Sequence, residues 1–356
     1  SDVSAASAAV IVAQTGELIY GKNEHVQRGM ASTTKIMTAL LAIEAGEPER
    51  EITVTAEMLA VEGTSMGLLA GDTVTLDGLV YGMLLESGND AANVTAHTLA
   101  GDIPAFAQLM NAKARELGMK NTSFANPSGL TDENHYSTAY DMALLGAYAM
   151  KNVRFRDIAS RTSARVSYGN PPYVRTLTNH NRLLKSYDGA IGIKTGFTKA
   201  SGRCLVSAAE RNGITLVAVT LTAPNDWADH TKLLDYGFSL AENKTADTDF
   251  SSVSVKVTGG MLPSVGAVAS GNVSVAMGAA NTDKIERRIY AEPFLYAPVK
   301  AGRIIGRAEY LVNGKVVAET QLVAASDVAA VKTEPKKEEG EGFFLKVKEF
   351  FIKLFT

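Results

Sequence analysis

The pattern of apolar and polar positions divides the chain into a helical middle with strands on either side. Strand-like runs at 8–13 and 17–20, separated by a turn at Thr15 and Gly16, predict a hairpin. Residues 32–44 are apolar almost throughout and predict a helix buried in the middle of a domain. Helical periodicity continues in four further segments, at 76–85, 90–99, 103–117 and 140–150.

Strand character returns after residue 165. Residues 203–209 and 215–221 predict a hairpin around Asn212 and Gly213, a pair that favours a tight turn. Strand pairs at both ends therefore enclose the helices. This arrangement favours an α+β domain, with an antiparallel sheet that contains both the first and the last strands and is flanked by a helical cluster.

From about residue 250 the helical periodicity disappears. Asn313 and Gly314 mark another hairpin turn there. The strand-like segments lie at 252–257, 273–277, 288–290 and 303–312. We therefore expect a first domain over residues 1–243 and a small all-β domain over residues 244–328.

The end of the chain differs in composition from both domains. Residues 329–342 are charged, contain glycine and proline, and predict a linker. In residues 343–356, phenylalanines and aliphatic residues cover one broad face of a helical wheel, opposite Lys346, Glu349 and Lys353. This stretch is too short and too charged to span a bilayer. Either it packs on the second domain or, as we favour, it is an amphipathic helix that anchors the protein to a membrane surface.

Composition excludes several classes of protein. A net charge of -3 argues against a nucleic-acid partner. Cys204 is the single cysteine, so an intramolecular disulfide is excluded, and no Cys/His spacing fits a zinc site. We expect neither a metal nor another cofactor. Residues 1–12 lack the features of a signal peptide, which fits a cytoplasmic protein or a mature secreted form.

The candidate chemistry lies in three short motifs, Ser-Thr-Thr-Lys at 32–35, Ser-Gly-Asn at 87–89 and Lys-Thr-Gly at 194–196. A lone Ser-x-x-Lys is expected about once in a chain of this length. Ser-Gly-Asn also recurs at 270–272, so neither motif is specific alone. Together and in this order they supply a nucleophile, a base and a carboxylate-binding edge, as an acyl-transfer site requires.

In the first motif, Ser32 and Lys35 lie three residues apart and share one face of the predicted helix. Lys35 can accept the proton of the Ser32 hydroxyl only when neutral, which requires burial or a nearby cation. The start of the helix also presents backbone N–H groups to a developing oxyanion. The alternative is a capping serine with a solvated lysine, which the buried character of the helix disfavours.

The second motif follows one apolar helix and precedes Asp90, which we expect to cap the next helix. In such a loop Ser87 can relay a proton and Asn89 can hold a peptide amide. The alternative is ordinary turn chemistry, in which these residues have no catalytic role.

The third motif follows a strand-like run at 190–193. A strand edge that presents Lys194 and Thr195 suits a substrate carboxylate, and Gly196 permits close approach of a ligand. The alternative is an edge-strand lysine that protects against aggregation.

The three motifs, with residues 124–130 and 135–143, resemble the low-molecular-mass penicillin-binding proteins that are serine D-alanyl-D-alanine carboxypeptidases. The resemblance covers essentially the whole chain. It implies a β-lactamase/transpeptidase-like first domain, a β-rich second domain and a C-terminal amphipathic anchor. It also implies a bacterial cell-envelope enzyme at the outer face of the cytoplasmic membrane, acting on peptidoglycan stem peptides that end in D-Ala-D-Ala.

The same resemblance implies catalytic roles for three residues. Ser32 is the acylated nucleophile, Lys35 its general base and Ser87 the proton relay. Attack on the D-Ala-D-Ala carbonyl releases D-Ala, and water then hydrolyses the acyl-enzyme. β-Lactam antibiotics acylate the same serine and act as covalent inhibitors.

Binding roles also follow from the resemblance. Asn89 holds the peptide backbone, and Lys194, Thr195 and Gly196 receive the terminal carboxylate. The backbone N–H groups of Ser32 and Phe197 form the oxyanion hole.

One binding residue expected from the family is missing. Some members clamp the carboxylate with an arginine, but residues 224–229 contain none. Arg203 either takes this role or is only a surface residue.

Three rival functions stay open at this stage. A β-lactamase shares the fold and motifs, and Glu133 lies in the interval where such enzymes hold a glutamate, although its neighbours resemble the carboxypeptidase pattern. A DD-endopeptidase also cuts next to a D-alanine. A non-catalytic β-lactam-binding protein would retain the fold without turnover.

Overall fold

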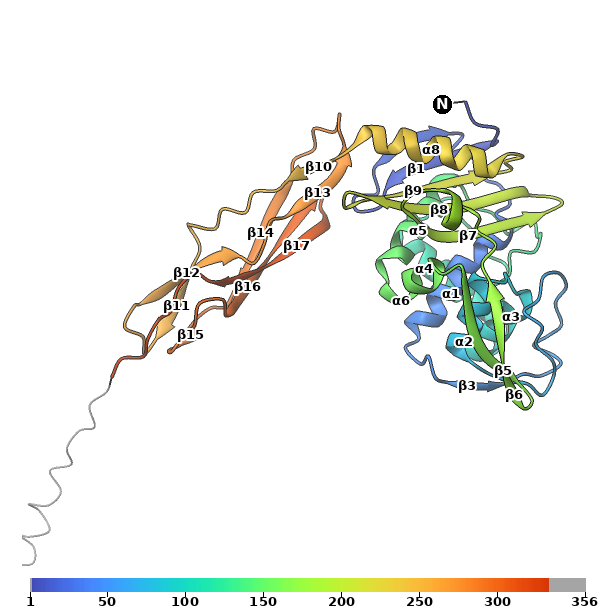
Figure 1. The fold of residues 1–356 in the computed structure, drawn as a ribbon, viewed down its shortest axis with the longest axis horizontal. Coiled ribbons are helices and arrows are strands. Elements are labelled where there is room, and N and C mark those ends of the chain that lie inside the picture. The colour runs from blue at the N-terminus through green and yellow to red at the C-terminus, as the bar shows by residue number, and fades with distance from the viewer. Residues whose placement is uncertain (1, 333–356) are drawn as a thin grey trace, which may run out of the picture. The chain divides into compact units, whose positions relative to one another are not determined.

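The computed structural model describes residues 2–332 (Figure 1). The predicted anchor at 343–356 and most of the predicted linker lie outside these residues. The described chain divides into two compact units. The first contains the residues up to Ala246 together with Ser274–Glu286 and Leu311–Ala318; the second contains Asp247–Val273, Arg287–Tyr310 and the described residues from Glu319 onward.

The first unit is built on a five-stranded antiparallel sheet with the order β2-β1-β9-β8-β7. Its strands are β1 (Ser7–Val12), β2 (Leu18–Lys22), β7 (Ala190–Thr198), β8 (Gly202–Arg211) and β9 (Ile214–Leu221). The predicted hairpins at both ends of the domain are confirmed. Because β1 pairs with β9, the first and last strands share one sheet, as expected. β7 lies at the edge of this sheet.

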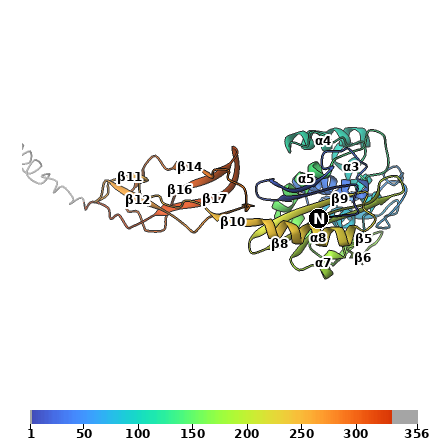
Figure 2. The same ribbon diagram turned by 90° about the horizontal axis from the view of Figure 1, so that it is seen from above.

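Helices cover both faces of this sheet. Helix α8 (Asp226–Leu240) packs on one face, and α5 (Ala139–Lys151) packs on the other (Figures 1 and 2). Helix α1 (Lys35–Glu44) lies on the same side of the sheet as α5 and packs against it. The strand residues alternate between two apolar clusters, since Val10 faces the α8 side and Ile11 the α5 side. The remaining helices of this unit are α2 (Leu76–Leu84), α3 (Asn89–Ala100), α4 (Ile103–Glu116), α6 (Val153–Ala159) and α7 (Leu183–Ser186).

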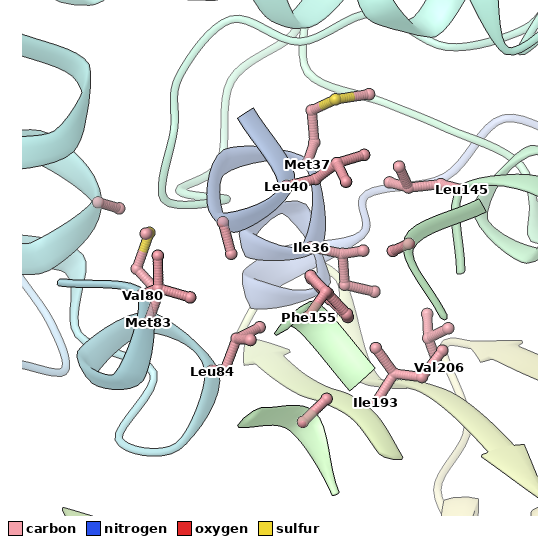
Figure 3. Close-up of a cluster of buried hydrophobic side chains, with 14 of the residues drawn as sticks. Ile36, Met37, Leu40, Val80, Met83, Leu84, Leu145, Phe155, Ile193 and Val206 are labelled. Atoms are coloured by element: carbon pink, nitrogen blue, oxygen red, sulfur yellow. The ribbon is translucent and has the colours of Figure 1, made fainter. Parts of the chain in front are cut away.

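Helix α1 is central to the larger cluster. Its side chains Ile36, Met37 and Leu40 are fully buried and lie among residues of the surrounding helices and of the sheet (Figure 3). A helix that is apolar on all sides requires such a position, as the sequence indicates. The predicted start at Ser32 is wrong, because Ala31–Thr34 form the 3₁₀ turn η1 and the α-helix begins at Lys35.

A small four-stranded sheet lies beside α2, with the order β3-β4-β5-β6. Its strands are β3 (Glu51–Thr53), β4 (Thr73–Thr75), β5 (Ser163–Gly169) and β6 (Pro172–Thr178). The first unit ends with β10 (Ala241–Thr245), which pairs with β13 (Ser274–Gly278).

The described part of the second unit contains strands and no helix. Its sheet has the order β14-β16-β17-β12-β11-β15. The strands are β11 (Ser254–Thr258), β12 (Ser264–Ala269), β14 (Glu286–Ala291), β15 (Leu295–Tyr296), β16 (Ile304–Val312) and β17 (Lys315–Ala324). The predicted α+β domain with an all-β successor is confirmed.

Candidate active site

Ser32 lies at the start of the helix that crosses the core. It is half-buried within η1, and the preceding residue, Ala31, has a φ of 48°. A left-handed backbone is unfavourable for alanine, and such conformations concentrate at functional sites. Gly129 packs directly against the carbonyl of Ala31 and has no space for a side chain, because a Cβ on Gly129 would lie 1.9 Å from that oxygen. The serine is thus presented on a tight, closely packed turn.

Lys35 is completely buried one turn further along the chain. Its Nζ lies 2.9 Å from Ser32 Oγ, 2.7 Å from Asn89 Oδ1 and 2.7 Å from the carbonyl oxygen of Ser128. Burial and the charge of Lys194 hold the pKa of Lys35 well below its usual range, with Asp90 opposing them. A neutral amine has two N–H donors and a lone pair. In the neutral form the two carbonyl-type oxygens would use these donors, and the lone pair would be left for the Ser32 hydroxyl.

The Ser-Gly-Asn segment joins α2 to α3 and meets Lys35 through Asn89. The Asn89 amide nitrogen donates to the carbonyl of Glu62 at 2.6 Å while its Oδ1 accepts from Lys35. Ser87 has a φ of 62° and is 6% exposed. Within residues 2–332 the Ser87 hydroxyl has no hydrogen-bond partner, which leaves it available to a bound molecule.

The predicted capping role of Asp90 is wrong. Gly88 is the residue at the N-cap, and Asp90 lies inside α3. Its buried carboxylate instead accepts backbone N–H bonds from Met66, Gly67 and Leu68 at 2.9–3.1 Å. Asp90 therefore fastens the preceding loop to the second motif.

The third motif lies on the edge strand β7. Lys194 is 1% exposed, and its Nζ donates to the carbonyl of Thr195 at 2.9 Å. Burial lowers the pKa of Lys194 to about 7. A Cβ on Gly196 would lie 2.9 Å from the backbone nitrogen of Ser32, which is closer than real Cβ atoms come. Glycine at 196 thus brings the strand edge against the turn that carries the serine.

The structure therefore brings the three motifs together. Ser32, Lys35 and Asn89 are linked by hydrogen bonds, Lys194 acts electrostatically on Lys35, and Gly196 contacts the turn. Phe197, the next residue on β7, is 63% exposed.

Arg203 lies opposite Phe197 on β8, but its guanidinium is already paired. Its Nε and Nη2 atoms each lie 2.9 Å from the Asp226 carboxylate, which is buried. The guanidinium also lies 5.7 Å from the Trp227 ring. A carboxylate clamp at Arg203 stays a prediction, and it would compete with this ion pair.

Sequence reasoning assigned no chemistry to the loop that follows α4. Its Ser128 carbonyl accepts from Lys35, and the Asn126 Oδ1 accepts backbone N–H groups on both sides of Gly129. Asparagine followed by proline and glycine is a turn signal. That signal gives the loop but not the contact with Lys35.

His135 supports the same loop from within. The Ala125 N–H donates to its Nδ1 at 3.0 Å, so the ring proton lies on Nε2 and is donated to Thr34 Oγ1 at 2.8 Å. Burial lowers the pKa of His135 to about 4; Asp132 opposes this shift and Lys35 adds to it. His135 therefore connects this loop to Thr34, the residue before Lys35.

Comparisons with known proteins identify the family. The sequence profile of the D-alanyl-D-alanine carboxypeptidases of peptidase family S11 matches residues 1–225. The chain belongs to this family. The resemblance drawn from the motifs is thereby confirmed, and the protein is a serine hydrolase, a D-Ala-D-Ala carboxypeptidase. The profile of the penicillin-binding protein 5 C-terminal domain matches residues 241–330, where the all-β unit was expected.

Individual relatives extend the match over nearly the whole carboxypeptidase. It is 33% identical to the D-alanyl-D-alanine carboxypeptidase DacF of Bacillus subtilis, over 91% of this chain and 86% of that protein. The solved D-alanyl-D-alanine carboxypeptidase DacD of Francisella tularensis superposes with a TM-score of 0.63 at 28% identity, covering 93% and 95% of the two chains. A D-alanyl-D-alanine endopeptidase of Escherichia coli is 31% identical, over 62% of this chain and 72% of its own.

Two features are absent from the described part of the carboxypeptidase, a cluster of metal ligands and a membrane-spanning helix. Within residues 2–332 no group of three His, Cys, Asp or Glu side chains is placed to hold a metal ion. No helix of this part is long and apolar enough to cross a membrane.

Proposed function

We propose that Ser32 is acylated by the penultimate D-alanine of a peptidoglycan stem peptide, with release of the terminal D-alanine, and that water then hydrolyses the acyl-enzyme. The observation that carries this assignment is the hydrogen-bond set of Lys35. Its Nζ lies within hydrogen-bond distance of Ser32 Oγ, Asn89 Oδ1 and the Ser128 carbonyl; in the neutral amine the two N–H donors would serve Asn89 and Ser128, and the lone pair would face Ser32. Lys35 would remove the hydroxyl proton as Ser32 attacks the carbonyl carbon.

The proton must next reach the leaving amine. We assign this relay to Ser87, whose hydroxyl has no other partner among residues 2–332. The left-handed backbone of Ser87 supports a functional role, because such conformations of non-glycine residues concentrate at functional sites.

The terminal carboxylate would bind at the edge of β7. Lys194 supplies a cation and Thr195 a hydroxyl, and the position of β7 at the edge of the sheet leaves this side open. We assign the oxyanion hole to the backbone N–H groups of Ser32 and Phe197. The close approach of Gly196 to the Ser32 nitrogen supports this pairing. Asn89 would hold the substrate backbone once its amide exchanges the Glu62 carbonyl for the peptide.

Two measurements test the proposal. Purified protein incubated with a stem pentapeptide ending in D-Ala-D-Ala should release one D-alanine per peptide. Labelled penicillin should form a long-lived adduct on Ser32, and Ser32→Ala should abolish the adduct while the protein stays folded. Labelling retained by Ser32→Ala would disprove the nucleophile assignment.

A DD-endopeptidase activity is the second candidate, because one relative carries that name. A cross-linked muropeptide dimer distinguishes the two, since only an endopeptidase converts it to monomers. A β-lactamase would instead turn over penicillin rapidly and leave the pentapeptide intact. Glu133 lies exposed in its loop, which does not favour a role in holding a hydrolytic water. A non-catalytic penicillin-binding protein would form the adduct and release no D-alanine.

We further propose that residues 343–356 bind a membrane surface and hold the enzyme in the bacterial cell envelope, at the outer face of the cytoplasmic membrane. The support is their amphipathic sequence. Deletion of these residues should release the protein from liposomes, and unchanged binding would contradict the anchor.

A further inference from the structure

One end of the second unit exposes large apolar side chains. Met261 and Leu262, in the turn between β11 and β12, are 71% and 51% exposed. Tyr296 is 67% exposed and pairs in register with Thr258 at the end of β11. Val331 is 53% exposed. We call Met261, Leu262, Tyr296 and Val331 the apolar tip.

The backbone of the apolar tip is fixed by hydrogen bonds, whereas its side chains are exposed. Met261 N–H donates to the carbonyl of Ala329 at 2.8 Å, and Val331 N–H donates to that of Gly259 at 2.9 Å. Gly260 forms a bridge with Ala330, and a Cβ on Gly260 would lie 2.8 Å from Val328. The exposure therefore belongs to an ordered turn. Side chains of this size normally pack, so a fixed surface that presents them points to something outside the unit.

Lysines lie close to the apolar tip along the chain. Lys332 follows Val331 and is exposed, and Lys256 is exposed on β11, two residues before Thr258. Lys300 lies four residues after Tyr296, and its ammonium is paired with Asp327 at 2.8 Å. Apolar side chains with a tyrosine and surrounding lysines match the boundary between lipid headgroups and acyl chains. Lysines are also attracted to anionic headgroups.

The course of the chain favours a membrane over a protein as the occupant. Lys332, the last described residue, follows Val331, whose N–H donates to the carbonyl of Gly259 just after β11. β11 pairs with β15 at this end of the sheet (Figure 1). The ten residues 333–342 between it and the apolar 343–356 segment can extend at most about 36 Å. The apolar tip and that segment can therefore reach one surface. A single lipid-binding element gives only marginal attachment, and stable attachment takes two.

We propose that the apolar tip inserts into the membrane interface as a second attachment point, separate from residues 343–356. This goes beyond the proposed catalytic function and does not depend on it. The occupant we assign is a bilayer containing anionic lipid.

Vesicles of phosphatidylcholine and phosphatidylglycerol test the proposal with the full chain. The double variant Met261→Ser with Leu262→Ser should lower the partition coefficient about tenfold, because two apolar side chains no longer leave water. The matched control is Val268→Ser with Ile289→Ser, which removes two side chains that are 44% and 39% exposed but lie outside the apolar tip. This control should partition as the parent does. Equal partitioning of both double variants would overturn the proposal.

A site-specific probe locates the contact. Leu262→Cys can be labelled with an environment-sensitive fluorophore, since the native Cys204 is fully buried. Emission should shift to the blue when vesicles are added, and the same label at Val268→Cys should not respond. Emission from the Leu262 label that is already blue-shifted relative to the Val268 label before vesicles are added would overturn the proposal. If that shift disappears in a chain ending at residue 342, the tail covers the apolar tip; if it depends on protein concentration, a second copy does.

The same vesicles separate this proposal from the anchor. Deletion of residues 343–356 tests the anchor alone. A deleted chain that loses binding, together with a Ser double variant that binds as the parent does, would retain the anchor and reject the apolar tip. A deleted chain that keeps measurable binding, further reduced by the Ser double variant, would support the apolar tip without the anchor.

Discussion

Two lysine environments in the first unit differ in burial and in the presence of hydrogen-bonded carboxylates. Lys113 on α4 lies 3.0 Å from Glu44 and 2.9 Å from Glu116. Burial alone would lower the pKa of Lys113, but hydrogen bonds to Glu116 and Glu44 raise it. Lys35 and Lys194 are more deeply buried, and among residues 2–332 only neutral oxygens lie within hydrogen-bond reach of them.

The comparison bears on the proposed role of Lys35 as the general base, since lysine is normally a cation. Burial without a bound carboxylate disfavours the charged form. Asp90 does oppose the shift at Lys35, but its oxygens are engaged with backbone N–H groups of the loop before the second motif. The Asp90 carboxylate thus lies near Lys35, but its hydrogen bonds are made to the backbone of the loop and not to the Lys35 ammonium.

The largest effect should come from removing the base itself. Lys35→Gln should lower the rate of acylation by penicillin by about a thousandfold, because no group remains to accept the Ser32 proton. Lys113→Gln, the matched control on the paired lysine, should acylate at the parent rate. Comparable rates for the two variants would contradict the role of Lys35.

A smaller effect should follow from giving Lys35 the environment of Lys113. Asn89→Asp places a carboxylate beside Nζ and should raise the pKa of Lys35, so the acidic limb of the acylation rate profile moves to higher pH. A shift of about two units would lower the rate at neutral pH about a hundredfold. Asn89→Ala removes the amide without adding charge and should slow the reaction without that displacement. Identical pH profiles for the two variants would show that charge is not the cause.

His135 extends the comparison to stability. Its pKa is about 4 in the folded state and about 6.5 when unfolded, so protons bind preferentially to the unfolded chain as the pH falls below 6.5. The free energy of unfolding should therefore decrease on acidification, by about 2 kcal/mol from this group at pH 5. Urea titrations at pH 7.5 and pH 5 should show that His135→Gln reduces this difference.

His25→Gln is the control for that experiment, because the His25 side chain is 57% exposed. It should leave the dependence on pH unchanged. Equal dependence in both variants would mean that other groups account for the acid sensitivity.

The smallest effect concerns Lys194. With a pKa of about 7, it is protonated below pH 7 and loses its charge above, so affinity for a substrate carboxylate should fall as the pH rises past 7. KM for a peptide ending in D-Ala-D-Ala should rise up to about tenfold per pH unit, while a substrate with an amidated terminus should show little change. Parallel profiles for the two substrates would remove Lys194 from carboxylate binding.

Sequence patterns predicted the elements better than their junctions. The buried helix after Ser32, the shared sheet and the all-β second unit follow from periodicity and turn signals, which are local. The left-handed φ of Ala31 and the 3₁₀ turn at Ser32 were missed, because they depend on packing against Gly129 and Gly196, which are far away in the sequence.

In the site, too, local relations could be predicted from the sequence and contacts between distant segments could not. The pairing of Ser32 with Lys35 follows from their spacing, since three residues bring side chains to one face. The Ser128 contact of Lys35 is made by a backbone carbonyl, and a carbonyl carries no residue type that a motif could reveal. The loop contacts of Asp90 were likewise missed, because a local capping role was the simpler prediction from its position.

The contact at Gly196 has a consequence for inhibition. Because the strand touches the backbone of Ser32 and Thr33 at this point, the gap available to a ligand is set by the missing side chain. A substituent at 196 would push the strand and the serine apart, and the distance between carboxylate site and nucleophile would grow for every ligand alike. A substitution of Gly196 that lowered acylation by β-lactams would therefore also lower activity on the natural peptide, since both ligands would have to span the same distance between β7 and Ser32.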